Sequence, residues 1–139
     1  MDAGMENANI SDSPIEASCH CGDIKVTVPR KPDSINECQC TICRRYAAAW
    51  AYYNTKEVKF ETREGGSTRK YVWGDREIEF HFCNACGCIL YWWPIIERIT
   101  EMGVNTRMMD PDALRTITRK QSFSALFQEL KSKNESETP

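Results

Sequence analysis

The sequence predicts a single, mainly β domain built from antiparallel strands. Hydrophobic and polar residues alternate over residues 24–28, 57–61 and 77–82. A repeat of two is typical of strands that bury one face and expose the other. The chain has 139 residues, of which 41% are hydrophobic, and this suits one domain with a core of its own.

Turn-forming segments separate these strands. "PRKPDS" follows the first strand, "EGGS" lies near residue 65, and "WGDRE" connects a strand that ends at Trp73 to one that starts at Glu77. Glycine, proline and aspartate favour turns in such segments. The strands on either side of "WGDRE" are therefore expected to form a hairpin.

The C-terminal part of the chain is expected to combine two strands with short helices. "CILYWW" is typical of a strand that Pro94 stops, and another strand is expected over residues 99–104. "DPDAL" at residues 110–114 predicts a short helical turn. Apolar residues recur at helical spacing in "SFSALFQELK", which predicts a short C-terminal helix over residues 122–131, packed against the sheet.

The folded domain is expected to cover residues 15–130. The polar residues 1–14 and 131–139 are expected to form a disordered leader and a disordered tail. The sequence shows neither a secretion signal nor the roughly 20 consecutive apolar residues that cross a membrane. We therefore expect a cytoplasmic or nuclear protein with reduced thiols. A net charge of −2 makes nucleic acid an unexpected partner.

The eight cysteines are the strongest functional signal. They fall into three compact groups: Cys19 and Cys21; Cys38, Cys40 and Cys43; and Cys83, Cys86 and Cys88. Metal ligands come in pairs one or two residues apart, whereas disulfides usually spread cysteines to close long loops. The grouping predicts metal binding. Zinc is favoured over an iron–sulfur cluster because the chain lacks a ferredoxin-like run.

The first and third groups together provide four sulfur ligands. "FCNACG" has the form of a zinc knuckle, in which a tight turn presents Cys83 and Cys86 and a glycine relieves the backbone. "CHCG" adds Cys19 and Cys21. A zinc ion bound by these four residues would join an early strand to a late hairpin.

The spacing leaves the middle group with two alternatives. In one, Cys88 completes the triplet of Cys38, Cys40 and Cys43, so that eight cysteines close two tetrahedral sites. In the other, the triplet binds a second zinc ion with one open position, and Cys88 is an ordinary thiol. Structural zinc sites usually have four protein ligands, whereas catalytic sites keep a position open.

Histidine and aromatic residues receive less specific predictions. His20 lies between two proposed ligands and should point to the opposite face of its strand, so it is not expected to bind metal. His81 alternates with glutamates and is expected at the surface. Tyr46, Trp50, Trp92 and Trp93 could line a pocket, but aromatic residues of a β domain more often belong to the core.

The order and spacing of the three cysteine motifs resemble those of a known family. "ASCHCGDIKVTV", "CQCTICRR" and "FHFCNACGCIL" together resemble the glutathione-dependent formaldehyde-activating enzymes, a family that includes the centromere protein V-like proteins. "VNTRMMD" at residues 104–110 is similar to a late strand of that family. The resemblance covers about residues 16–115.

The resemblance implies an antiparallel, zinc-bearing β-tent fold with two zinc ions. Structural zinc ligands would be Cys19, Cys21, Cys83 and Cys86, and catalytic zinc ligands would be Cys38, Cys40 and Cys43. The implied reaction adds glutathione to formaldehyde and gives S-hydroxymethylglutathione, formally a carbon–sulfur lyase reaction in the synthetic direction. This sequence departs from the family at Gln39, where many members carry histidine, and at Cys88, where a small polar residue is common.

The chemistry of three thiolates suits this activity. They give a zinc site a net charge of −1, which makes the metal a poor Lewis acid but still able to deprotonate a bound thiol. Arg44 and Arg45 directly follow Cys43 and could anchor the carboxylates of glutathione. Two other functions are compatible with the residues: a non-catalytic zinc module that binds a partner, and the same mechanism with a different thiol.

Overall fold

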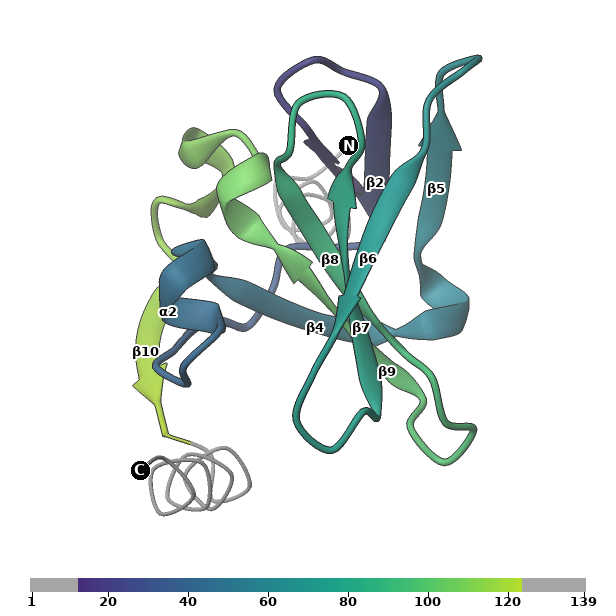
Figure 1. The fold of residues 1–139 in the computed structure, drawn as a ribbon. Helices are drawn as coiled ribbons and strands as arrows, with labels where there is room; N and C mark the ends of the chain where they lie inside the picture. Colours follow the sequence, from purple (N-terminus) through teal and green to yellow (C-terminus); the bar gives the residue numbers. More distant parts are fainter. Residues whose placement is uncertain (1–12, 124–139) are drawn as a thin grey trace, which may run out of the picture.

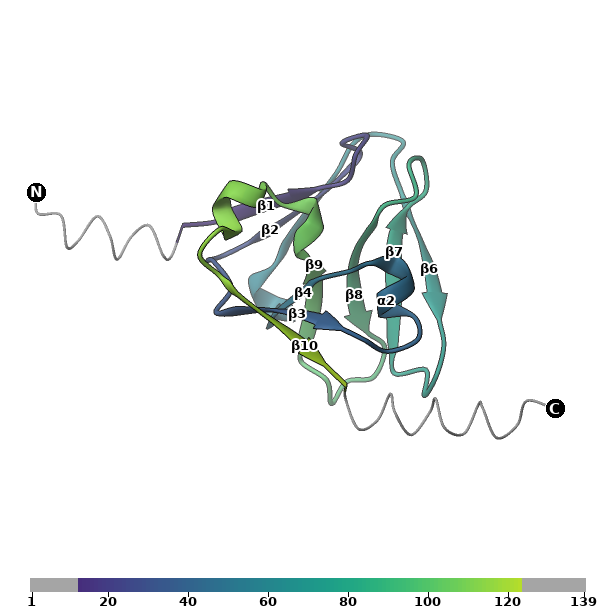
Figure 2. The same cartoon turned by 90° about the vertical axis from the view of Figure 1, so that its left-hand side faces the viewer.

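The computed structural model describes residues 13–123, which form two β-sheets and several short helical segments (Figures 1 and 2). The strands are β1 (Ile15–Ser18), β2 (Ile24–Val28), β3 (Ser34–Cys38), β4 (Trp50–Asn54), β5 (Lys59–Thr62), β6 (Thr68–Val72), β7 (Ile78–Cys83), β8 (Ile89–Pro94), β9 (Glu101–Asn105) and β10 (Thr118–Ser122). The helical segments are α2 (Cys43–Tyr46), η1 (Thr55–Glu57), η2 (Thr106–Met108) and η3 (Pro111–Leu114).

The strands are divided between a small sheet and a large one. The small sheet has the order β1-β2-β5, and the large one has the order β10-β3-β4-β9-β8-β7-β6. Neighbouring strands are antiparallel except β10 and β3, which are parallel. Figure 2 shows β10 alongside β3, close to α2. The fold is therefore mainly β, as predicted, with one parallel pair that the sequence does not indicate.

The alternating stretches predict most of the central strands. β2 has the predicted bounds and buries Ile24, Val26 and Val28. β6 and β7 form the predicted hairpin, and η3 begins at Pro111, within the predicted helical turn. Asp110 caps η3 because its side chain accepts a hydrogen bond from the backbone N–H of Asp112.

Two local predictions need correction or lie outside the described residues. β5 is exposed along its whole length, and Phe60 keeps 42% of its surface accessible, so this strand is not half-buried. Phe60 instead packs edge-on against Trp93 of β8. The predicted C-terminal helix begins at Ser122, which is the last residue of β10, and from residue 124 onward it lies outside the described residues.

The two faces of the large sheet pack into different hydrophobic cores. On β4, Ala51 and Tyr53 belong to a core that also includes β1 and β2, whereas Trp50 belongs to a second core. β7 divides in the same way, since Phe80 lies in the second core and Cys83 in the first. The alternation follows from the two-residue repeat of a strand, which sends successive side chains to opposite faces.

Within the described residues 13–123, no helix has the length and apolarity needed to cross a membrane.

Candidate metal centres and an adjoining cavity

A four-cysteine group joins the two sheets. Cys19 and Cys21 lie in the turn between β1 and β2, Cys83 ends β7, and Cys86 lies in the turn before β8. Their ligand atoms all lie within 4.8 Å of one another. In Figure 1 the β1–β2 and β7–β8 turns lie side by side at the top of the molecule. The group therefore connects an early turn to a late hairpin, as the sequence predicts.

Tight turns orient the side chains of these four cysteines toward one another. The backbone N–H of Gly22 donates to the carbonyl of Cys19, and that of Gly87 donates to the carbonyl of Cys83. Gly22 and Gly87 have φ angles of 84° and 80°, in the left-handed region that glycine adopts without steric cost. The backbone N–H of Ile24 also points to the Cys19 sulfur, at 3.4 Å.

The sulfur spacing fits a tetrahedral metal ion such as zinc. The sulfur of Cys21 lies 3.7 Å from that of Cys19 and 3.6 Å from that of Cys83. Zinc–sulfur bonds of about 2.3 Å separate tetrahedral sulfur ligands by roughly 3.8 Å. A disulfide would instead bring two sulfurs to about 2.05 Å. All eight cysteines are free thiols.

The three-cysteine group surrounds the start of α2. Cys38 ends β3, Cys40 lies in the following turn, and Cys43 is the first residue of α2. The three side chains are buried, and their sulfurs also lie within 4.8 Å of one another. The helix ends at once because Ala47 adopts a left-handed conformation with φ of 55°. The turn before the helix, which the hydrogen bond from the Arg44 N–H to the Cys40 carbonyl closes, brings Cys43 back to Cys40.

Two N–H donors point at the sulfurs of this group. The backbone N–H of Cys43 donates to the Cys40 sulfur at 3.4 Å, and the indole N–H of Trp50 donates to the Cys43 sulfur at 3.3 Å. Hydrogen bonds from Cys38 and Cys43 lower the pKa of Cys40 to about 3. Hydrogen bonding with Cys40 raises the pKa of Cys38, and hydrogen bonding with Cys38 and Cys40 raises the pKa of Cys43, so Cys40 is the member of the group held as a thiolate, the form that binds a metal.

Cys88 lies beside the four-cysteine group. Its side chain packs against the first core together with Cys21 and Cys86, and its thiol interacts with that of Cys86. The triplet belongs to the second core. Among the described residues, the triplet therefore brings three cysteine sulfurs together without a fourth cysteine, which favours the alternative with an open position.

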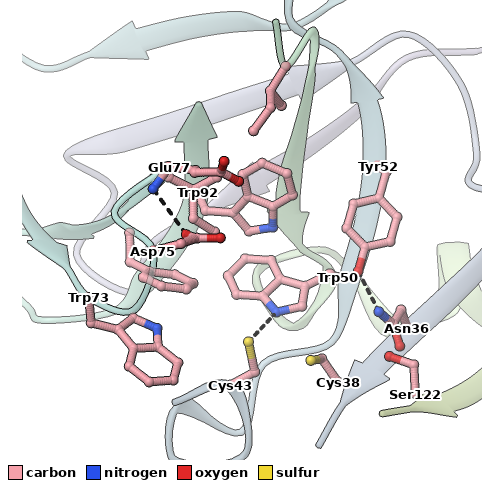
Figure 3. A pocket seen from close by; sticks show the side chains of 13 residues that line it. Asn36, Cys38, Cys43, Trp50, Tyr52, Trp73, Asp75, Glu77, Trp92 and Ser122 are labelled. Carbon is pink, nitrogen blue, oxygen red and sulfur yellow. Dashed lines mark hydrogen bonds between the residues drawn. The ribbon is translucent and has the colours of Figure 1, made fainter. Parts of the chain in front are cut away.

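A cavity of about 230 Å³ opens beside the triplet, and Cys38 and Cys43 form part of its wall (Figure 3). Most of the wall is aromatic or aliphatic: Trp50, Tyr52, Trp73, Ile78, Phe80, Trp92 and Ile99. The remaining lining residues are Asn36, Ser122 and the acidic Asp75 and Glu77. The wall thus combines thiols and an apolar surface, and no described residue contributes a basic side chain to it.

Tyr52 and Asn36 provide the polar contact inside the cavity. The Asn36 side-chain amide donates to the Tyr52 hydroxyl oxygen at 2.5 Å (Figure 3). The amide oxygen of Asn36 is buried and has no hydrogen-bond partner among the described residues. Partial burial beside the cavity raises the pKa of Tyr52 to about 12, so its hydroxyl remains protonated at neutral pH.

The predicted arginines lie outside this cavity. Arg44 and Arg45 are exposed on α2, and neither lines the cavity. The Arg45 side chain donates to the carbonyl of Thr41 at 2.7 Å. Both arginines directly follow Cys43 in the sequence, but they lie outside the cavity. Their role in binding substrate stays a prediction.

The aromatic residues divide between the cavity and other contacts. Trp50 and Trp92 line the cavity, whereas Tyr46 packs on Phe80 and Trp93 packs on Phe60. Tyr52 and Trp73 also line the cavity, although no sequence motif singles them out. Tyr52 stands two residues after Trp50, so the two-residue repeat of β4 was the signal that could have identified it.

The prediction that His81 is a surface residue is wrong. Only 12% of its side chain is exposed. Its Nδ1 lies 2.9 Å from the Thr68 hydroxyl, its Nε2 lies 2.5 Å from Glu79, and its ring stacks on Tyr91 at 4.5 Å. His20 is exposed and belongs to neither cysteine group.

Comparison with known proteins places these features in a family. The family model described as glutathione-dependent formaldehyde-activating enzyme matches residues 14–124. The crystal structure of a Rhodobacter sphaeroides protein aligns with a TM-score of 0.61 and 22% identity, over 76% of this chain and 100% of that one. This likeness supports the fold alone. No curated protein matches.

The family match spans most of the chain and includes all eight cysteines, the cavity wall and both sheets. The cysteine motifs and the observed fold agree with it. The chain therefore belongs to the glutathione-dependent formaldehyde-activating enzyme family.

Proposed function

We propose that this chain is a zinc-dependent enzyme of carbon–sulfur lyase type that adds glutathione to formaldehyde and gives S-hydroxymethylglutathione. One observation carries the proposal: a buried group of three cysteines forms part of the wall of a cavity. A metal centre that served only to stabilise the fold would have no need to adjoin a cavity.

Two zinc ions per chain fit the donor sets. Cys19, Cys21, Cys83 and Cys86 would hold the structural ion, and Cys38, Cys40 and Cys43 would hold the catalytic one. A zinc ion with an open position supplies one kind of chemistry when bound, since it keeps a substrate thiol deprotonated at a pH below the thiol's ordinary pKa of about 8.5.

Tyr52 is the residue best placed to act on the carbonyl oxygen. Because its hydroxyl oxygen accepts the hydrogen bond from Asn36, its own proton is left for another acceptor. A carbonyl oxygen in the cavity would be such an acceptor. A donor at this position stabilises the negative charge that develops on oxygen as the sulfur attacks.

The proposed step is a simple addition without oxidation or reduction. The thiol sulfur donates an electron pair to the carbonyl carbon, so a carbon–sulfur bond forms and the carbonyl π bond breaks. The oxygen receives that electron pair and takes the proton of Tyr52, which is then restored from solvent. The proton lost by the thiol balances the one gained by the product.

Arg44 and Arg45 would meet the carboxylates of glutathione outside the cavity. Over residues 13–123 the cavity wall contains no basic side chain, whereas α2 exposes both arginines next to Cys43. Guanidinium groups pair well with carboxylates. In this arrangement the thiol end reaches the triplet while the charged ends remain in solvent.

The test compares adduct formation from glutathione and formaldehyde in the presence of wild type, Cys40→Ser and Tyr52→Phe. Because the uncatalysed reaction also occurs, the rate is measured by exchange NMR at equilibrium and the background is subtracted. We expect Tyr52→Phe to lower the catalysed rate by about 10²-fold with both zinc ions retained. Cys40→Ser should lose one zinc ion and all catalysis.

Native mass spectrometry supplies the metal count for each variant. Equal, background-level rates for wild type and Cys40→Ser, with the structural zinc retained in both, would contradict the enzyme proposal and favour the non-catalytic module. A rate above background with cysteine but not with glutathione would indicate a different thiol substrate.

A further inference from the structure

The cavity is larger and more apolar than formaldehyde requires. Its volume is about 230 Å³, whereas an apolar cavity of about 150 Å³ is already large enough for benzene. Formaldehyde has only two non-hydrogen atoms, so it would leave most of the aromatic wall without a contact. The volume therefore matches a reactant that carries a ring or an alkyl chain of similar size.

The charges around the cavity indicate which of the two reactants, glutathione or the aldehyde, carries this ring or alkyl chain. Asp75 and Glu77 are the charged residues of its wall. The Asp75 carboxylate accepts the backbone N–H of Glu77, and the Glu77 carboxylate pairs with Arg98. Glutathione carries two carboxylates, which an apolar wall with acidic neighbours would disfavour. The aldehyde, which is uncharged, is the reactant that suits the cavity.

We infer that the cavity binds the apolar substituent of a larger aldehyde, of benzaldehyde size, with the carbonyl between Tyr52 and the triplet. This inference rests on the proposed function, because it names the second substrate of the same reaction. Trp50, Trp73 and Trp92 contact the ring, and Tyr52 donates to the carbonyl oxygen. Glutathione adds as proposed above, so the product is the corresponding hemithioacetal.

A binding experiment tests the cavity without any reaction. Acetophenone has a ring and a carbonyl but adds thiols poorly, and acetone has the carbonyl alone. In full-length, zinc-loaded protein labelled with ¹⁵N, acetophenone should shift the indole N–H signals of Trp50, Trp73 and Trp92. Trp93 does not line the cavity and serves as the internal control. Acetone should leave all four signals in place.

A kinetic experiment tests the substrate class. With glutathione as the thiol, kcat/KM divided by the uncatalysed rate constant of the same aldehyde should be at least about tenfold larger for benzaldehyde than for formaldehyde, as burial of a phenyl ring predicts. Ile99→Trp narrows the cavity and should lower the benzaldehyde rate more than the formaldehyde rate. Ile95→Trp is the matched control, since Ile95 is exposed in the same β8–β9 segment and lies outside the cavity.

The outcomes separate this inference from the proposed function. Catalysis with formaldehyde, no preference for benzaldehyde and unmoved indole signals would overturn the inference and leave the proposed function standing. Background rates with both aldehydes would overturn the proposed function and, with it, the substrate assignment. Shifted indole signals together with the benzaldehyde preference support the inference.

Discussion

The four-cysteine and three-cysteine groups have similar spacing in the sequence but different surroundings in the fold. The first lies where turns of the two sheets meet, and it holds four sulfurs from two distant segments. The second comes from residues 38–43 alone and adjoins a cavity. A group that links distant segments contributes to folding, whereas a local group with a missing ligand is available for chemistry.

The largest effect is expected for Cys83→Ser. Cys83 is fully buried at the junction of the two sheets, and the variant removes one of the four proposed zinc ligands. We expect the free energy of unfolding to fall by roughly 5 kcal/mol or more, a large part of the stability of a small domain. Thermal unfolding followed by circular dichroism measures this loss.

Cys40→Ser is the matched control for Cys83→Ser, since it also removes one proposed zinc ligand, but from the three-cysteine group. It should remain folded and keep one zinc ion. If Cys83→Ser stayed folded and Cys40→Ser unfolded, the three-cysteine group, and not the four-cysteine group, would be the one that stabilises the fold.

Gly103→Ala should disturb the cavity rather than the four-cysteine group. Gly103 pairs with Trp92 across β8 and β9, and a Cβ at this position would lie 2.1 Å from Nε1 of the Trp92 indole. The indole must move, and overpacking of this kind usually costs about 1–3 kcal/mol. Denaturant unfolding measures the loss, and aldehyde kinetics should show a lower rate.

A double variant checks the cause of that effect. Trp92→Phe reduces the size of the side chain, so Gly103→Ala should cost less in the Trp92→Phe background than in wild type. Equal costs in the two backgrounds would show that contact with the indole is not responsible.

A smaller effect is expected for His81→Gln, on the β7 face that also carries Cys83. Burial lowers the pKa of His81 below its ordinary value of 6.5, although Glu79 opposes this shift. As the pH falls through 6.5, the unfolded chain takes up a proton before the folded one, so the free energy of unfolding declines toward the folded pKa. His81→Gln should flatten this decline, as measured by Tm from about pH 7 to pH 5. The exposed His20 provides the control, because His20→Gln should retain the decline.

The smallest effect is expected for Cys88→Ser. Cys88 lies beside the four-cysteine group but is not one of its four ligands. The variant should keep two zinc ions by native mass spectrometry and change the free energy of unfolding by less than about 1 kcal/mol. Loss of the second zinc ion would show that Cys88 serves the triplet after all.

Local signals made the two cysteine groups predictable. Ligand spacing within "CHCG", "CQCTIC" and "CNAC" is a property of a few neighbouring residues, and all seven proposed ligands occur in the two groups. The strands with clear alternation were predictable for the same reason. β10 was not, because "TRKQS" has no hydrophobic repeat, and its pairing with β3 joins two segments that are far apart in the chain.

The cavity could not be predicted, because its wall comes from segments that are far apart in the chain. Trp50 and Tyr52 lie on β4, Trp73 follows β6, and Trp92 lies on β8. Each could equally have been a core residue from its sequence context alone. Only the order of strands in the large sheet brings these four side chains together.

The alternation of side chains across the large sheet has an evolutionary consequence. Trp50, Phe80 and Trp92 face the core that adjoins the cavity, whereas their strand neighbours Ala51 and Trp93 pack on the opposite side. Substitutions at one set of positions can reshape the cavity while the other set keeps the two sheets joined. A family with this fold can therefore diversify its substrates through a few alternate strand positions, without rebuilding the four-cysteine group where the two sheets meet.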